Sequence, residues 1–192
     1  MIISIGGTQG SGKSTIAKMI AEKLNWPRYY MGEIRREAAK KMGLTLAEYN
    51  KLGEKDPSTD LEVDKLQEEL GKTKDDFIIE GRTSWHFIPH SLKIYLDVKD
   101  EVGAQRIFKN LKTNSKRNED KNLDTVEDVL RSTRARQESD NKRYKKYFNI
   151  NVHNKNNYDF YLDTSDLKIE EVFNKTFEFI EKNLKRTSVD KS

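Results

Sequence analysis

Eight residues near the start of the chain have the types and spacing of a phosphate-binding loop. Residues 7–14 read Gly-Thr-Gln-Gly-Ser-Gly-Lys-Ser and fill every fixed position of the pattern G-x-x-x-x-G-K-[ST]. Glycines let backbone N–H groups turn towards phosphate oxygens. Lys13 can reach the β- and γ-phosphates of a nucleoside triphosphate, and the Ser14 hydroxyl can ligate Mg²⁺. The residues expected to bind the triphosphate are Gly7, Thr8, Gln9, Gly10, Ser11, Gly12, Lys13, Ser14 and Thr15.

The segments around this loop have the order that the pattern requires. Residues 2–5 form a short apolar stretch, long enough for one buried strand. After the loop, apolar residues recur at helical spacing up to Leu24, and the start of that helix near Lys13 directs its positive dipole end at the same anion. Strand, loop and helix therefore favour a functional triphosphate site over a chance match.

Alternating strand and helix patterns along the rest of the chain predict an α/β fold with a parallel sheet. A capping box at residues 45–48 predicts a helix from about residue 46, and a second helix is expected from about Asp56–Thr59 to Leu70, with Asp56 as its cap. Further helices are expected over 100–111, 125–147 and 168–184, with a mobile excursion at 113–123 and a frayed tail after Lys185. Five short segments read as strands: 2–5, 28–30, 77–80, 93–97 and 159–163.

Two inserts interrupt the predicted sheet. About 45 residues separate the second and third strands, many more than a compact crossover needs. A second excursion, between the fourth and fifth strands, is rich in basic residues. A phosphate loop with a helical insert and a basic lid suits an enzyme that closes over two nucleotides, because water in an open site would hydrolyse the triphosphate.

Several short motifs resemble those of a known enzyme family. The segment 30–36, Tyr-Met-Gly-Glu-Ile-Arg-Arg, resembles the acceptor-binding Ser/Thr-x-Gly-x-x-x-Arg of adenylate and cytidylate kinases, with Tyr30 in place of the small hydroxyl residue. Glu80-Gly81-Arg82 resembles the acidic-Gly-Arg motif of cytidylate kinases, and Arg136-x-x-x-Asp140-x-x-Arg143 matches their Arg-x-x-x-Asp-x-x-Arg. Arg106-Ile107 is similar to the Arg-Ile that opens the lid, and Thr164-Ser165 to the loop beside the donor base. The chain resembles a compact, archaeal-type cytidylate kinase from residue 2 to about 184.

This resemblance implies a single kinase domain over residues 1–192: a three-layer α/β sandwich with the sheet order 2-3-1-4-5, a core of 1–30, 72–112 and 148–184, an acceptor-binding insert at 31–71 and a lid at 113–147. It implies ATP and Mg²⁺ as cofactors, a monomer, and transfer of the γ-phosphate to CMP or dCMP. By the same match, Lys13, Arg82 and Arg136 are catalytic, and Arg106 and Ser165 lie at the donor. The acceptor is bound by Gly32, Arg36, Arg82, Asp140 and Arg143, while Ser14 and Glu80, the latter through water, serve the metal.

Simple electrostatics supports the arginine assignments. Two nucleotides bring several negative charges into one cleft, and arginine grips phosphate at two oxygens without losing its charge. Positions 136, 140 and 143 share one helix face, and Asp140 can hold the two flanking arginines with lone pairs left for a substrate. The alternative is a surface ion-pair stripe of little energetic weight. Arg134 is either a second lid arginine or a partner of Glu138.

Composition excludes other classes of protein. The chain has 192 residues, 34% hydrophobic and 35% charged, with no cysteine, so disulfides and thiolate chemistry are excluded. No run approaches the roughly 20 apolar residues of a membrane span, and the first strand leaves no room for a leader, so we expect a cytoplasmic protein without a membrane partner. The net charge of +4 is small, which makes a nucleic-acid partner unexpected.

Other functions are compatible with parts of this pattern. A regulatory GTPase would need Asn-Lys-x-Asp for guanine, and residues 154–157 read Asn-Lys-Asn-Asn. An adenylate or other monophosphate kinase, and a small-metabolite kinase for a sugar or shikimate-like acid, share the expected fold. A non-catalytic nucleotide- or RNA-binding module is the alternative of a different class.

Overall fold

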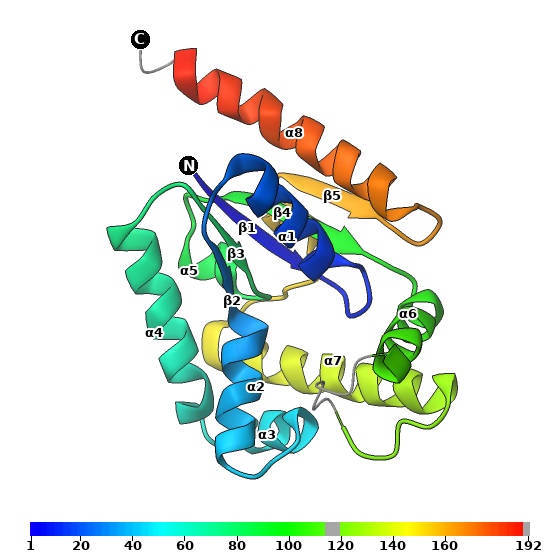
Figure 1. The fold of residues 1–192 in the computed structure, drawn as a ribbon. Coiled ribbons are helices and arrows are strands. Elements are labelled where there is room, and N and C mark those ends of the chain that lie inside the picture. Colours follow the sequence, from blue (N-terminus) through cyan, green and yellow to red (C-terminus); the bar gives the residue numbers. More distant parts are fainter. Residues whose placement is uncertain (114–119, 190–192) are drawn as a thin grey trace.

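The computed structural model describes residues 1–113 and 120–189, and its centre is a parallel sheet of five strands in the order β2-β3-β1-β4-β5 (Figure 1). The predicted strand order is confirmed. Each strand pairs in parallel with its neighbours. The strands are β1 (Ile2–Gly7), β2 (Arg28–Tyr30), β3 (Phe77–Glu80), β4 (Leu92–Asp97) and β5 (Phe160–Asp163).

One face of the sheet packs on the helices α1 (Lys13–Leu24) and α8 (Ile169–Val189), which lie side by side in Figure 1. The central strand β1 is buried along its whole length, which is why residues 2–5 are apolar apart from Ser4, whose buried hydroxyl accepts from Ser91 at 2.8 Å. Ile16 and Ile20 of α1 meet the strands in this core, with Val172 and Ile180 of α8 beside them. The burial of α8 against the sheet follows the expected apolar pattern, but the helix continues past Lys185 to Val189, where a frayed tail was predicted.

The long segment between β2 and β3 folds into helices, as expected: α2 (Met31–Lys41), α3 (Leu46–Gly53) and α4 (Ser58–Thr73). The capping box at Thr45 and Glu48 is present. Helix α4 begins one residue later than predicted, because Pro57 and not Asp56 is its N-cap. The Asp56 carboxylate still accepts from the Ser58 N–H at 2.9 Å. The short helix α5 (Ser84–Phe87) follows β3, and α4 and α5 cover the second face of the sheet.

The segment between β4 and β5 supplies α6 (Asp100–Thr113), α7 (Val126–Phe148) and a 3-10 turn at Lys155–Asn157. Helices α6 and α7 pack on each other through Ala104, Ile107 and Val129. Much of the excursion expected at 113–123 falls on residues 114–119, which lie outside the described residues.

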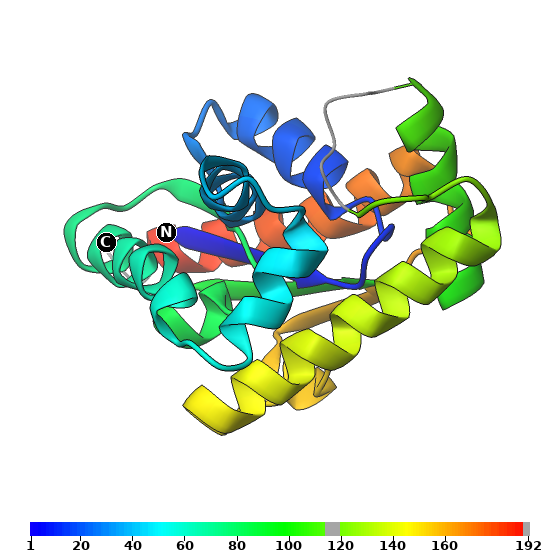
Figure 2. The same ribbon diagram turned by 90° about the horizontal axis from the view of Figure 1, so that it is seen from below.

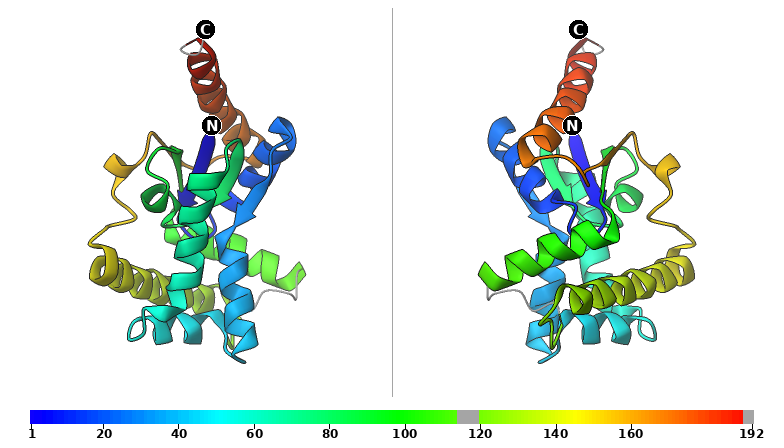
Figure 3. Two further views of the ribbon diagram at one scale, coloured as in Figure 1. Left: turned by 90° about the vertical axis from the view of Figure 1, so that its left-hand side faces the viewer. Right: turned by 90° about the vertical axis from the view of Figure 1, so that its right-hand side faces the viewer.

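Helix α7 crosses the lower end of the molecule in Figure 1, from α6 to the insert helices, while α8 and both termini lie at the opposite end. Seen from that lower end, α7 runs across the front beside α3 (Figure 2). Tyr147 and Lys146 donate to the backbone carbonyls of Gly53 and Glu54 at 2.9–3.2 Å, so α7 is tied directly to the insert. The side views show the same arrangement, with α2, α3, α6 and α7 grouped below the sheet (Figure 3). The insert and α7 therefore form one structural unit at the carboxyl end of β1.

Candidate active site

The loop after β1 has the shape that a phosphate cradle requires. Gly10 and Gly12 have φ values of 79° and 85°, in the left-handed region that favours glycine. Gly12 caps α1 without a side-chain hydrogen bond, which leaves the first N–H groups of that helix for an anion. Lys13 Nζ donates to the carbonyl of Thr8 at 3.3 Å, across the mouth of the loop.

Buried polar side chains hold the start of this loop. The Thr8 hydroxyl donates to the Asp97 carboxylate at the end of β4 and lies 3.2 Å from the Tyr95 hydroxyl. Gly7 packs against the backbone of β4. Only glycine fits there, because a Cβ at this position would collide with the Leu96 carbonyl. Thr8 is 5% exposed, so its side chain supports the loop while its backbone belongs to the cradle.

Ser14 and Glu80 meet where β1 and β3 end side by side. Ile5 stands opposite Glu80 in the parallel register, and the Ser14 hydroxyl donates to the buried Glu80 carboxylate. Arg28 Nη1 lies 3.3 Å from the other oxygen of Glu80. Hydroxyl and carboxylate oxygens suit Mg²⁺, which keeps several waters and takes the rest of its ligands from phosphates. The described residues contain no group of three or more acidic or histidine side chains placed to hold a metal ion, and such a Mg²⁺ site needs none.

Arg106 of α6 lies beside the phosphate loop. Its guanidinium donates to the carbonyl of Thr164 at 2.8 Å and to the Thr164 hydroxyl at 3.1 Å, and it reaches the carbonyl of Gly10 at 3.5 Å. Ser165 accepts from the backbone N–H of Lys99 at 2.9 Å, which fixes the loop that holds Arg106. Arg106 lines an open groove with Thr15, whereas the buried Ser165 side chain does not line it.

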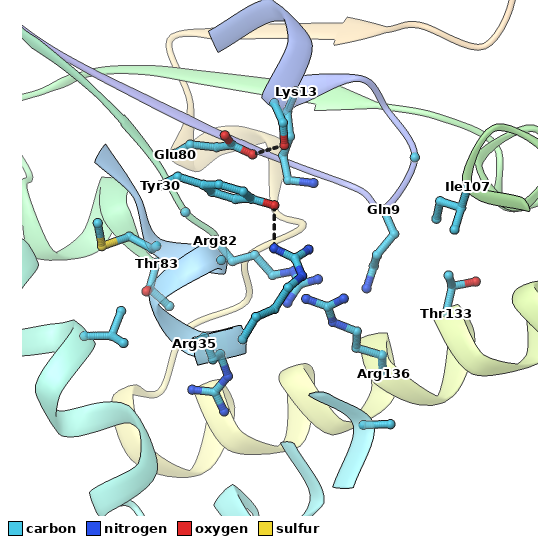
Figure 4. Close-up of a pocket in the computed structure, with 18 of the residues that line it drawn as sticks. Gln9, Lys13, Tyr30, Arg35, Glu80, Arg82, Thr83, Ile107, Thr133 and Arg136 are labelled. Carbon is cyan, nitrogen blue, oxygen red and sulfur yellow. Dashed lines mark hydrogen bonds between the residues drawn. The ribbon is translucent and has the colours of Figure 1, made fainter. Parts of the chain in front are cut away.

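A second cavity opens between the phosphate loop, α2, α4 and α7 (Figure 4). Five basic side chains line it against three acidic ones, which makes it a site for anions. Figure 4 shows Lys13 and Glu80 on one side of the cavity and Arg136, from α7, on the other. The basic lining residues are Lys13, Arg35, Arg36, Arg82 and Arg136.

Tyr30 stands between two arginines at the mouth of this cavity. Arg36 Nη1 donates to the Tyr30 hydroxyl at 2.8 Å, and the Arg36 and Arg28 guanidiniums lie 5.4 and 5.5 Å from its ring centre. Gly32 allows this arrangement, since a Cβ there would come within 2.7 Å of the Tyr30 ring. Tyrosine therefore replaces the small hydroxyl residue of the resembling motif with a longer side chain that holds Arg36 in place.

Five charged side chains, three of them lining the cavity and two behind it, alternate in sign from α2 to the end of β3. Arg35 pairs with Asp60, Asp60 with Arg143, Arg143 with Asp140, and Asp140 with Arg82. Arg143 is 0% exposed and Asp140 1%. Burial acts to raise the pKa of Asp140, but the guanidiniums of Arg82 and Arg143 hold it below its usual value. The chain of charges joins the insert, α7 and the sheet.

The sequence-predicted arginine set is therefore split. Arg36, Arg82 and Arg136 line the cavity together, with Gly32. Asp140 and Arg143 lie behind them, and neither side chain lines the cavity. Their burial excludes the alternative of a surface ion-pair stripe at these two positions. Arg134, by contrast, is exposed and pairs with Asp100 and Glu101 of α6 at 3.0 and 2.9 Å. The expected pairing with Glu138 is wrong, because Glu138 pairs with Lys142.

Sequence reasoning missed three residues of this site: Arg35, Asp60 and Asp64. All three line the cavity. Asp60 and Asp64 are spaced i, i+4 on a helix whose other buried positions include Val63 and Gln67, so two acidic residues on a buried face were a usable signal. Arg35 gave no such signal, because its neighbour Arg36 already occupies the arginine position of the motif at 30–36.

The fold and the loop together define a P-loop protein in which a helical insert walls a cavity beside the loop. Solved structures of similar fold include a shikimate kinase from Bacteroides thetaiotaomicron (TM-score 0.60, 14% identity, 96% of this chain and 98% of that one) and an uncharacterized protein from Eubacterium ventriosum (TM-score 0.68, 16% identity, 94% and 98%). At such identities the likeness concerns the fold alone.

Sequence comparison gives a narrower assignment than the likeness of fold. The cytidylate kinase from Methanocaldococcus jannaschii is 38% identical over 179 residues, covering 91% of this chain and 94% of the relative. The cytidylate kinase from Methanosphaera stadtmanae is 34% identical over 174 residues, with 91% and 94% covered. Residues 2–166 match the profile of the cytidylate kinase-like family, and the chain belongs to that family.

Proposed function

We propose that this protein is a nucleoside monophosphate kinase that transfers the γ-phosphoryl group of ATP to CMP or dCMP, with Mg²⁺ as its metal. The observation that carries the proposal is the convergence of Arg36, Arg82 and Arg136 on one cavity that also reaches Lys13 of the phosphate loop. Membership of the cytidylate kinase-like family supports the choice of acceptor. No described helix is long and apolar enough to cross a membrane.

The donor binds in the groove along α1. Backbone N–H groups of residues 7–15 surround its phosphates, Lys13 neutralises the charge that builds on the transferred group, and Arg106 lies over the donor from α6. Ser14 and Glu80 would hold the metal, Glu80 through a water molecule. Mg²⁺ held there would offset the negative charge of the phosphates. Ser165 acts by shaping the loop that fixes Arg106.

The acceptor phosphate binds between the loop and α7. Arg36 is aligned by Tyr30 and grips the phosphate, while Arg82 and Arg136 lie where the donor and acceptor phosphates meet. Phosphoryl transfer needs alignment and charge neutralisation more than covalent chemistry, and the three convergent guanidiniums supply these together with Lys13. In this arrangement Asp140 and Arg143 serve the acceptor indirectly, by holding Arg82 and Asp60.

We propose that the insert (31–71) and the described part of the predicted lid, residues 120–147, enclose the acceptor. Because α7 is bound to α3 and to the buried chain of charges, we infer that closure moves α7 and the insert towards the phosphate loop together. We propose that the protein acts as a monomer, because the site as proposed requires no residue from a second copy of the chain.

A coupled assay with MgATP and each of AMP, CMP, dCMP, UMP and GMP tests the proposal. The expected result is magnesium-dependent ADP formation that is fastest with CMP or dCMP. Lys13→Ala should lower this rate by on the order of 100-fold or more. Lys18→Ala, which removes an exposed lysine of the same helix that pairs with Glu22, should leave the rate unchanged.

The rival functions give different results in the same assay. Turnover that is fastest with AMP would identify an adenylate kinase, and turnover with none of the five but with shikimate would identify a small-metabolite kinase. Binding of ATP without turnover of any acceptor would favour a non-catalytic module and would end the proposal.

A further inference from the structure

A hydrogen-bonded row of four side chains connects α7 to the phosphate loop, and the proposed transfer does not use its middle members. Gln137 Nε2 of α7 lies 3.3 Å from His153 Nε2, and His153 Nδ1 lies 2.6 Å from the Tyr95 hydroxyl. The Tyr95 hydroxyl lies 3.2 Å from the hydroxyl of Thr8, the second residue of the phosphate loop. The row therefore joins two elements that lie on either side of the proposed transfer.

The carboxylate at one end of the row determines the direction of its hydrogen bonds. Asp97 accepts from the Thr8 hydroxyl, so the Thr8 oxygen is left to accept from the Tyr95 hydroxyl. The Tyr95 oxygen then accepts from Nδ1–H of His153. This leaves His153 Nε2 as the acceptor for the Gln137 amide. The row is therefore complete when the imidazole is neutral.

The surroundings of His153 favour the neutral imidazole. Burial lowers the pKa of this histidine, and the nearby guanidinium of Arg82 acts in the same direction. Three carboxylates oppose this shift, those of Asp97, Asp140 and Asp100. Because the pKa stays below its ordinary value of 6.5, the imidazole is neutral at pH 7 and keeps one nitrogen as an acceptor.

Aromatic packing fixes the middle of the row. Tyr95 is 3% exposed, and its ring centre lies 4.8 Å from that of Tyr158 and 5.5 Å from that of Tyr161, on which it stacks. The Tyr158 hydroxyl donates to the carbonyl of Val152 at 2.7 Å, which anchors the segment that carries His153. In such close packing neither ring can move without displacing its neighbours, so the row fixes the spacing of its two ends.

We propose that His153 and Tyr95 are positioning residues, which hold the phosphate loop and the α7 arginine Arg136 in register for phosphoryl transfer. Gln137 does not line the cavity, but it directly follows Arg136, which does. At the other end, the backbone of Thr8 belongs to the phosphate cradle. The proposal rests on the function proposed above. A misplacement of about 1 Å between reacting groups can cost on the order of 100-fold in rate, so a rigid link between the two elements matters for the transfer step.

Two variants break the row at different points. Tyr95→Phe keeps the ring and its packing but removes the central hydroxyl, and Gln137→Met keeps the side-chain length but removes the amide. In rapid-quench single-turnover assays with saturating MgATP and CMP, each variant should lower the rate of phosphoryl transfer by about 10-fold. The dissociation constants of ATP and CMP, measured by calorimetry, should stay within about 2-fold of the wild-type values, because neither residue touches a nucleotide.

The double variant separates a connected row from two independent effects. Its rate should lie within about 3-fold of the slower single variant, because both changes remove the same connection. His153→Asn gives a second test that spares Tyr95. Its amide can still donate to the Tyr95 hydroxyl, but the shorter side chain does not reach Gln137. It should show the same loss of rate as Gln137→Met, with no further loss when the two are combined.

Two matched controls change neighbouring groups outside the row. Tyr29→Phe removes a β2 hydroxyl that accepts from Lys74 at 3.1 Å, and Glu138→Gln changes the exposed residue next to Gln137. Both should transfer the phosphoryl group at the wild-type rate.

Three results would contradict the proposal while leaving the proposed function in place. The first is a wild-type transfer rate in folded Gln137→Met and His153→Asn. The second is a loss of nucleotide affinity in these variants without a loss of transfer rate. The third is a double variant whose loss is the product of the two single losses. A folded wild-type protein that phosphorylates no nucleoside monophosphate would overturn the proposed function, and this inference with it.

Discussion

Replacing Asp140 by Asn should destabilise the protein strongly, because that carboxylate is the shared partner of two guanidiniums. Asp140 is 1% exposed and pairs with Arg143, which is 0% exposed, and with Arg82 at the cavity wall. Removing one member of a buried ion pair typically costs about 3–5 kcal/mol, since an unpaired charge stays behind. In a domain of this size, about 3 kcal/mol corresponds to a fall in Tm of roughly 6–12 °C.

Urea denaturation at pH 7 measures this loss. The matched control is Glu138→Gln, two residues earlier on the same helix, whose carboxylate is exposed and pairs with Lys142 at 2.9 Å. That pair should be worth less than about 1 kcal/mol. Adding Arg143→Met to Asp140→Asn removes one of the unpaired cations, so the double variant should be less unstable than the sum of the single variants.

The same group makes a pH prediction with a defined sign. The pKa of Asp140 is held below its ordinary value of 3.8 in the folded state, so its contribution to stability is present above that pH and is lost as the pH falls through the folded-state value. The difference in unfolding free energy between wild type and Asp140→Asn should therefore be constant near neutral pH and shrink in acid. A loss below about 1 kcal/mol at pH 7, or no change in the difference on acidification, would refute the conclusion that Asp140 balances two buried charges.

Three further changes test the site. Lys13→Ala should lower kcat by on the order of 100-fold or more with normal folding, because the lysine acts on the charge of the transferred group, and near-normal kcat would refute that role. Tyr30→Phe keeps the ring but removes the acceptor of Arg36, so the KM for CMP should rise about 10-fold and the KM for ATP stay unchanged; equal changes in both would indicate a general structural effect. Gly103→Ala should weaken ATP binding as measured by calorimetry, since its Cβ would come within 2.6 Å of the Gln9 carbonyl in the loop, and wild-type affinity would show that the loop can shift at no cost.

Much of the fold follows from local sequence patterns. The phosphate loop is contiguous, so its glycines, Lys13 and Ser14 could be read directly, and the apolar period of the flanking segments identified β1 and α1. The capping box at Thr45 and Glu48 located the start of α3. Helix ends were less certain because end positions depend on side-chain and tertiary contacts, as α8 and the start of α4 illustrate.

The roles of the charged side chains were decided by tertiary structure. The spacing of positions 136, 140 and 143 placed them on one helix face, but only packing against α4 and the end of β3 determined that Asp140 and Arg143 are buried while Arg136 reaches the cavity. Asp60, which joins Arg35 to Arg143, comes from a helix about 80 residues away along the chain from Arg143. An isolated sequence motif fixes which residues share a face of one helix; burial and charge pairing between distant segments exist only once the chain has folded.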